Sequence, residues 1–311
     1  MVSAMSTAEL DAITAVDLGD LAGSWYIALE AEGKSRATLK AYRAGVAGFL
    51  AWHAAQFPDA VPVLDRPAAA AYLADLRRAG QSPGTMRLRF GALRLFSAWL
   101  AEEGETSGDP LRSMKPPKGD KPVVPALSDA ELDALTRACR GTGFAARRDE
   151  ALVRLMAATG LRAGEVCDLR VSDVDLRGKT LVVRRGKGGK GRRIGIGPQA
   201  ARALDRYLRA RRAHRLAATD ALWLGEMGRS FGYQGLARAL GLRAKAAGID
   251  RFHPHRLRHS FASRWLAAGG SEDGLMATAG WTSRDMISRY TSDTAQSRAI
   301  EEAARLALDD F

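Results

Sequence analysis

Cysteine is scarce in this chain, and long apolar runs are missing. The two cysteines among 311 residues, Cys139 and Cys167, stand at no metal-like spacing, and each lies in a helical pattern typical of a small buried hydrophobe. So few cysteines exclude a disulfide framework and suit a reducing compartment. Because no apolar stretch is long enough to cross a bilayer, we expect a cytoplasmic protein with no membrane partner.

Basic residues are absent from the first 33 positions, which carry 6 acidic residues instead. These acidic side chains interrupt any apolar run at the start, so no secretory signal peptide is expected. Residues 34–94 hold 10 Lys and Arg against 3 Asp and Glu, and residues 111–311 hold 37 against 22. A net charge of +12 predicts a polyanionic partner, although a basic but inert surface would have the same composition.

Helical patterns fill residues 18–103, after a loose tail over residues 1–17. Four helices are expected, over about 18–30, 35–50 and 67–78 and from Ser82 onward. Basic residues gather in this segment, and we favour DNA contact over a merely solvated face for Lys34, Arg36, Lys40, Arg43, Arg87 and Arg89. Residues 104–126 contain so many Gly and Pro that no regular pattern survives, which predicts a basic linker.

Residues 127–311 combine helical patterns with a short stretch of period two. A capping box of Ser128 and Glu131 opens this second domain. Short strands are expected at 174–176, 180–184 and 192–196, joined by a Gly-rich turn between the last two. Helices are expected over about 147–159, 162–169, 198–215, 232–247, 254–268, 272–279, 283–290 and 294–308. The predicted fold class is mainly α with one small antiparallel β-sheet.

Three of the five histidines fall in one stretch, residues 252–262. Pro254 suits a first helical turn, which would put His255 and Arg258 at positions i and i+3 on one helical face. A titratable imidazole beside a permanent cation with forked donors suits an oxyanion, and a phosphodiester is the common biological one.

Two further stretches offer basic groups that favour phosphate. Arg162 follows a helix stop at Gly160, where backbone amides also favour an anion, and Glu165 stands one turn on, where it could hold the guanidinium. Lys187 lies in the Gly-rich hairpin turn, with Lys190 as the alternative in the same turn. Each feature alone has an ordinary explanation, as a surface ion pair or a solvated turn.

A fourth stretch, residues 280–291, contains Trp281 and Tyr290, either of which alone would be assigned to the core. Together, the four stretches resemble the tyrosine recombinases, the phage-integrase and Xer family. The family pattern has an Arg in a G-L-R-x-x-E run, a Lys in a β-hairpin, H-x-x-R, a His or Trp after a Gly, and a Tyr nine residues later. In this chain the pattern falls on Arg162 with Glu165, Lys187, His255 with Arg258, Trp281 and Tyr290.

The resemblance is close over residues 126–295 and looser over 18–103, where the family carries a helical, SAM-like core-binding domain. Many members have His where Trp281 stands, and Trp also occurs. The resemblance implies a site-specific recombinase or integrase in which Tyr290 attacks a DNA phosphodiester and forms a 3′-phosphotyrosyl link. Two arginines would stabilise the phosphorane, a histidine would act as base and a lysine as acid. The chemistry needs no ATP, no metal and no other cofactor.

The resemblance also implies double-stranded DNA as the partner. Related recombinases act as homo-oligomers, with a dimer on each site and a tetramer in synapsis, with or without a partner recombinase. They pass a C-terminal helix between protomers, and the apolar stripe of the helix expected over 294–308 suits such an exchange. The alternative is a helix packed on its own domain.

Three competing hypotheses stay open. A metal hydrolase could use His253, His255 and His259, because the last two stand at the i, i+4 spacing that zinc uses, but Arg256 and Arg258 lie between them. A DNA-binding regulator with an inactive site would share the fold. A topoisomerase would share the phosphotyrosine chemistry, but the N-terminal bundle and the short chain favour a recombinase.

Overall fold

A computed structural model of the chain describes residues 17–118, 125–184, 191–226, 231–281, 283–284 and 287. The chain divides into two compact units, residues 1–122 and 123–311. The predicted positions of Lys187, Lys190 and Tyr290, and of the helix over 294–308, lie outside the described residues. Within the described ranges, every helix is too short or too polar to span a bilayer.

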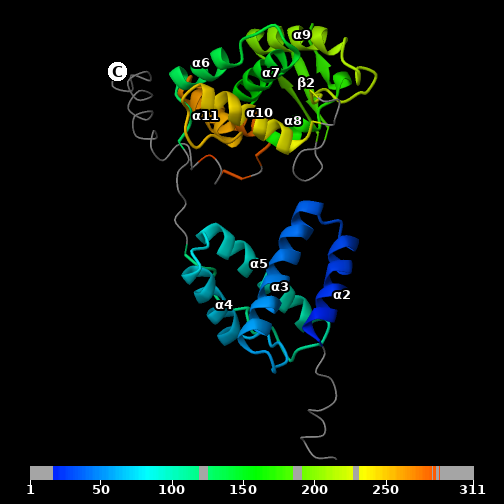
Figure 1. The fold of residues 1–311 in the computed structure, drawn as a ribbon, viewed down its shortest axis with the longest axis vertical. Helices are drawn as coiled ribbons and strands as arrows, with labels where there is room; N and C mark the ends of the chain where they lie inside the picture. Colours follow the sequence, from blue (N-terminus) through cyan, green and yellow to red (C-terminus); the bar gives the residue numbers. More distant parts are fainter. Residues whose placement is uncertain are drawn as a thin grey trace, which may run out of the picture. The chain divides into compact units, whose positions relative to one another are not determined.

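The described part of the N-terminal unit is helical (Figure 1). Its helices are α2 (Leu18–Ala31), α3 (Arg36–Gln56), α4 (Arg66–Arg78) and α5 (Pro83–Glu102). The predicted starts at Ser35 and Ser82 are confirmed, because their hydroxyls accept from the backbone N–H groups of Thr38 (3.2 Å) and Thr85 (3.1 Å). Local capping chemistry therefore sets where two of these helices begin.

Aromatic side chains fill the core of this unit. Trp25 of α2, Phe49 of α3 and Phe96 of α5 are buried there. Helices α3 and α5 pack along each other, and a Cβ built on Gly45 of α3 would come within 2.5 Å of the Ala92 Cβ of α5. The absence of a side chain at Gly45 thus allows the close approach of these two helices.

The first part of the predicted linker, residues 104–118, packs on the N-terminal unit. Leu111 is fully buried in its core. The Asp109 carboxylate accepts from the Ser97 hydroxyl (2.5 Å) and from the Leu111 backbone N–H (2.9 Å). One apolar side chain and one turn-capping carboxylate thus anchor a segment in which Gly and Pro prevent regular structure.

The described C-terminal unit is mainly helical, with one small sheet (Figure 1). Its helices are α6 (Asp129–Ala138), α7 (Phe144–Thr159), α8 (Ala163–Cys167), the 3-10 helix η1 (Val171–Asp173), α9 (Pro198–Arg211), α10 (Tyr233–Ala246), α11 (His255–Ala267) and α12 (Glu272–Ala279). The predicted capping box is confirmed, because Ser128 N–H donates to the Glu131 carboxylate (2.8 Å) and Glu131 N–H donates to the Ser128 hydroxyl (3.2 Å).

Helix α9 ends at Arg211, earlier than the sequence pattern predicts. The buried Arg211 guanidinium donates to the carbonyls of Ala217, Thr219, Ala221 and Leu222, at 2.6–3.2 Å. The chain after the helix is thereby folded back over the helix end. Backbone acceptors supplied from a later segment, which no periodicity reveals, account for the early stop.

The sheet is three-stranded and antiparallel, in the order β1 (Val174–Asp175), β2 (Thr180–Val183) and β3 (Arg192–Gly195). The predicted strands are present but shorter than expected at their ends. Leu181 pairs with Ile194, and both side chains are buried. The buried face of the sheet thus joins the main core of the unit.

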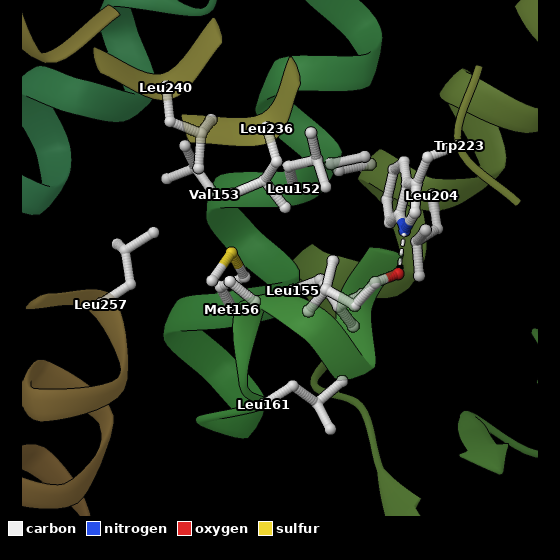
Figure 2. Close-up of a cluster of buried hydrophobic side chains, with 14 of the residues drawn as sticks. Leu152, Val153, Leu155, Met156, Leu161, Leu204, Trp223, Leu236, Leu240 and Leu257 are labelled. Atoms are coloured by element: carbon white, nitrogen blue, oxygen red, sulfur yellow. Dashed lines mark hydrogen bonds between the residues drawn. The ribbon is translucent and has the colours of Figure 1, made fainter. Parts of the chain in front are cut away.

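Helix α7 supplies much of that core (Figure 2). It packs against α9 and α11, and it buries Leu152, Leu155 and Met156. The indole N–H of Trp223 donates to the Val166 carbonyl at 2.8 Å, which pins the end of α8 to this core. Both cysteines were expected to be buried: Cys139 is fully buried, whereas Cys167 is only half-buried. Burial raises the pKa of Cys139 to about 12, so it is held as a neutral thiol.

Candidate active site

Three arginines from three different elements converge on the C-terminus of α12. Arg192 Nε donates to the Thr278 carbonyl (2.9 Å), Arg258 Nη2 to the Ala279 carbonyl (2.9 Å) and Arg162 Nη2 to the Gly280 carbonyl (3.0 Å). The last carbonyls of a helix accept no hydrogen bond from an N–H group of the same helix, and they carry partial negative charge. Donors on a guanidinium group therefore stabilise them. The three cations are thereby gathered at one helix end.

Arg162 reaches this point because of the way α7 ends. Gly160 adopts φ +61°, which stops α7 in a left-handed cap, and Arg162 becomes the N-cap residue of α8. The expected contact with Glu165 is present, with Arg162 Nη1 3.1 Å from Glu165 Oε1. The Glu165 Oε2 atom also accepts from the Arg162 backbone N–H at 2.9 Å.

Glu165 is a buried carboxylate whose side chain is 6 % exposed. Burial raises the pKa of Glu165, but hydrogen bonds from Arg192 and from the Arg162 backbone, together with their charges, outweigh it and leave the pKa below its usual range. The carboxylate is therefore ionised at neutral pH and orients both guanidinium groups.

Arg258 and His255 lie on α11, as the sequence pattern predicts. Arg258 is 4 % exposed, and its Nη1 donates to the Gly160 carbonyl at 2.5 Å. Part of His255 reaches solvent, while partial burial of the ring lowers its pKa, with the charges of Arg258, His253 and Arg162 acting in the same direction. A neutral imidazole thus stands beside a cationic cluster.

Trp281 follows directly after the Gly280 cap. It is 5 % exposed and packs in a small core with Phe261 and Ile287.

Helix α11 also holds the end of the linker, because Ser260 Oγ accepts from the Leu127 N–H at 2.7 Å. The same helix therefore carries the His–Arg pair and fastens the segment that enters the unit.

Arg192 is the site residue that sequence reasoning missed. The sequence pattern indicates only a strand at this position, yet Arg192 Nη1 lies 3.0 Å from Glu165 Oε1 and Nη2 lies 3.0 Å from Oε2. The single available signal was a charged residue in a strand adjoining the Lys187 turn. Its position relative to Glu165 depends on how the sheet packs, which the strand pattern leaves open.

The histidine-based metal hypothesis gains no support from geometry. Among the residues that the structure describes, no three His, Cys, Asp or Glu side chains gather closely enough to hold a metal ion. His253, His255 and His259 are all among the described residues, so this result applies to them. The ring centroids of His253 and His255 are 6.4 Å apart, and the neighbouring Arg258 would repel a bound cation.

The six residues predicted to contact DNA all lie in the N-terminal unit. Lys34, Arg36, Lys40, Arg43 and Arg87 are exposed and Arg89 is half-buried. Lys34 pairs with Glu32 (3.0 Å), Arg43 pairs with Glu30 (2.9 Å), and Arg89 donates to the Tyr72 hydroxyl (2.8 Å). Among the described residues, Arg36, Lys40 and Arg87 take part in no ion pair.

Both units match known family models. Residues 125–297 match the Phage integrase family, and residues 23–104 match the Phage integrase, N-terminal SAM-like domain. Tyrosine recombinase XerC of Pseudomonas fluorescens is 34% identical over 233 residues, which cover 74% of this chain and 76% of that protein. Tyrosine recombinase XerC of Corynebacterium efficiens is 32% identical over 266 residues, or 85% of this chain and 83% of that protein.

Solved structures share the fold. A lambda integrase (75-356) dimer bound to a COC′ core site superposes with a TM-score of 0.70 at 18% identity, over 89% of this chain and 95% of that one. A lambda integrase tetramer bound to a Holliday junction gives a TM-score of 0.69 at 18% identity, over 91% and 80%. The chain therefore belongs to the phage integrase family of tyrosine recombinases, the site-specific enzymes that cut and rejoin DNA strands.

Proposed function

We propose that Tyr290 is the nucleophile of a DNA strand-exchange reaction carried out beside the α12 terminus. The tyrosine oxygen forms a bond to the scissile phosphorus, and the bond from phosphorus to the 5′-oxygen breaks. The product is a 3′-phosphotyrosine and a strand with a free 5′-hydroxyl. The observation that carries the proposal is the convergence of Arg162 and Arg258 on the carbonyls of Gly280 and Ala279, which precede Tyr290 by ten and eleven residues.

Arg162 and Arg258 supply the electrostatic stabilisation. The phosphorane formed during attack gains negative charge, and cations already fixed by the protein stabilise it without reorganisation. Arg162 gives one hydrogen on Nη1 to Glu165 and one on Nη2 to Gly280, which leaves its Nε–H and one hydrogen on each Nη for a phosphate oxygen. Arg258 is held more deeply and brings the second charge.

Proton transfer is assigned to His255 and Lys187. A free tyrosine has a pKa of about 10, so Tyr290 needs a base or strongly positive surroundings to attack at neutral pH. The lowered pKa of His255 keeps its ring neutral and able to accept that proton. Lys187 is the donor to the leaving 5′-oxygen, with Lys190 as the alternative. The phosphotyrosine conserves the energy of the broken bond, so a 5′-hydroxyl of another strand reverses the step without ATP.

The N-terminal unit is proposed to bind double-stranded DNA through Lys34, Arg36, Lys40, Arg43, Arg87 and Arg89. The dimer and tetramer of lambda integrase in the similar structures support a homo-oligomer on DNA, with a dimer on each site and a tetramer in synapsis. The same proposal includes exchange of the segment over 294–308 between protomers and action with or without a partner recombinase. It also includes a cytoplasmic location.

A nicked DNA site whose 5′ fragment diffuses away tests the nucleophile. The wild-type protein should accumulate a covalent adduct at the DNA 3′ end, including in excess chelator, and Tyr290→Phe should bind DNA without forming it. An adduct on another residue would disprove the assignment, and loss of activity that zinc restores would favour the hydrolase. Relaxation of supercoiled DNA without paired sites would favour a topoisomerase, and binding without any adduct would favour a regulator.

A further inference from the structure

Arg192 makes the most extensive side-chain contacts of the three converging arginines to Glu165. Its Nη1 lies 3.0 Å from Oε1 and its Nη2 lies 3.0 Å from Oε2, so the pair is bidentate. The Arg192 side chain is 13 % exposed and that of Glu165 is 6 % exposed, so solvent screens this pair only weakly. The third donor, Nε, is given to the Thr278 carbonyl at 2.9 Å.

The bidentate pair with Arg192 limits the hydrogen bonds that Glu165 can form with the Arg162 guanidinium. With both carboxylate oxygens engaged by Arg192, Glu165 offers the Arg162 guanidinium one oxygen, Oε1, at 3.1 Å. When a carboxylate faces only one guanidinium group, the favoured geometry is a pair of parallel hydrogen bonds between them. Loss of Arg192 would therefore let Glu165 turn toward Arg162 and draw its guanidinium away from the Gly280 carbonyl.

The charges lead to the same conclusion. One buried carboxylate faces two guanidinium groups, and its charge is met mainly by the bidentate partner Arg192. Arg162 therefore keeps more of its positive charge for an incoming phosphate. Without Arg192, Glu165 would neutralise Arg162 instead.

Arg192 also supports the turn that leads to Trp281. Gly280 has φ +65°, and a Cβ built there would come within 2.7 Å of Arg192 Nη1. The guanidinium therefore lies against the backbone of this cap while it holds the Thr278 carbonyl. Strand β3 is thereby tied to the start of the segment that carries Tyr290.

We infer that Arg192 is a positioning residue for strand cleavage, which acts through Glu165 and the 278–281 turn to hold Arg162 in its phosphate-binding orientation. The inference rests on the proposed function, because it assigns Arg192 a role in the Tyr290 reaction. It predicts a defect in the rate of cleavage, with DNA binding and folding largely retained.

The test measures adduct formation at saturating DNA with full-length protein. Arg192→Gln should slow cleavage about 10- to 100-fold, the order expected when a reacting group is displaced, and should leave the DNA dissociation constant within about twofold. Arg192→Lys guards against misfolding, and it should recover only part of the rate because an ammonium cannot make the bidentate pair. Arg193→Gln removes the same charge from the next, exposed position of β3 and is the matched control.

Two readouts separate positioning from a structural effect. On a scissile methylphosphonate, which lacks the anionic oxygen, the Arg192→Gln defect should shrink, because less charge has to be stabilised. Glu165→Gln combined with Arg192→Gln should cost no more than the worse single change, since both act through one contact. Wild-type cleavage by Arg192→Gln, an equal defect on both substrates, or an equal loss in Arg193→Gln would each overturn the inference, whereas failure of the wild-type protein to form an adduct would overturn the proposed function instead.

Discussion

Arg258 lies over the indole ring of Trp281, with the guanidinium carbon 5.2 Å from the ring centroid. Both residues are almost fully buried, so the attraction between the cation and the ring is little weakened by water. The contact joins α11 to the residue after the Gly280 cap. The permanent charge of the H-x-x-R motif is therefore held by a side chain from the segment that leads to Tyr290.

Trp281→Ala is expected to destabilise the protein by about 3–5 kcal/mol, because it leaves a cavity in a small core and removes the support of Arg258. Trp281→Phe should cost less and retain most of the cleavage rate, since a ring still faces the guanidinium. Urea unfolding and adduct formation measure the two effects. Trp265→Phe, which removes the hydrogen bond to the Ser271 carbonyl (2.9 Å), is the control and should cleave at the wild-type rate.

Glu165→Gln should reduce cleavage by about tenfold or more, because an amide orients two guanidinium groups less well than a carboxylate does. Glu150→Gln is a matched control. The Glu150 carboxylate also lies between two arginines, Arg154 and Arg206, each at 2.8 Å, in a different part of the unit. Single-turnover cleavage compares the two variants, and an equal loss in both would show that charge pairing in general is responsible.

The pH dependence of cleavage should follow the protonation of His255. Burial, then the charge of Arg258, disfavours the protonated ring and lowers its pKa, so the neutral base persists down to pH values below the usual pKa of about 6.5. Cleavage should therefore be flat near neutrality and fall only at lower pH, as the ring takes up a proton. His255→Gln should be slow and lose this acid limb, whereas His253→Gln should keep it. An unchanged acid limb in His255→Gln would place the base elsewhere.

Gly160→Ala should destabilise the C-terminal unit by about 1–3 kcal/mol, because the φ of +61° at this position is strained for a residue with a side chain. The new methyl group would also collide with the Phe261 ring. Gly164→Ala, where an added Cβ meets nothing within 4 Å, should be neutral or stabilising. Thermal unfolding of both variants measures the difference, and equal melting temperatures would contradict the role assigned to the left-handed cap.

DNA binding by the N-terminal unit should depend on Arg36 and Lys40, two exposed cations that form no ion pair among the described residues. Each change to Gln should reduce the slope of log affinity against log salt by about 0.9, the value for one phosphate contact. Arg78→Gln, at a residue paired with Asp75, is the control and should leave the slope unchanged. If Arg36→Gln and Lys40→Gln both keep the wild-type slope, as the control does, then these two residues do not contact DNA phosphates.

Local geometry explains why much of this protein could be predicted from its sequence. Helix starts at Ser35, Ser82 and Ser128 depend on bonds to residues three positions later, and α12 occupies the residues that its pattern indicates. The Arg162–Glu165 contact is of the same kind, because a spacing of three residues at a helix start brings the two side chains together. The family motif adds the order of the remaining groups along the chain.

The assembly of the site depends on contacts between residues far apart in the sequence. Arg192 and Glu165 are 27 positions apart, Arg258 and Gly160 are 98 apart, and Arg162 and Gly280 are 118 apart. Two of these contacts end on backbone carbonyls, which every residue possesses, so the acceptor leaves no mark in the sequence. Only the packing of α8, β3 and α11 against the end of α12 decides which carbonyls meet which arginines, and therefore where the positive charge is concentrated.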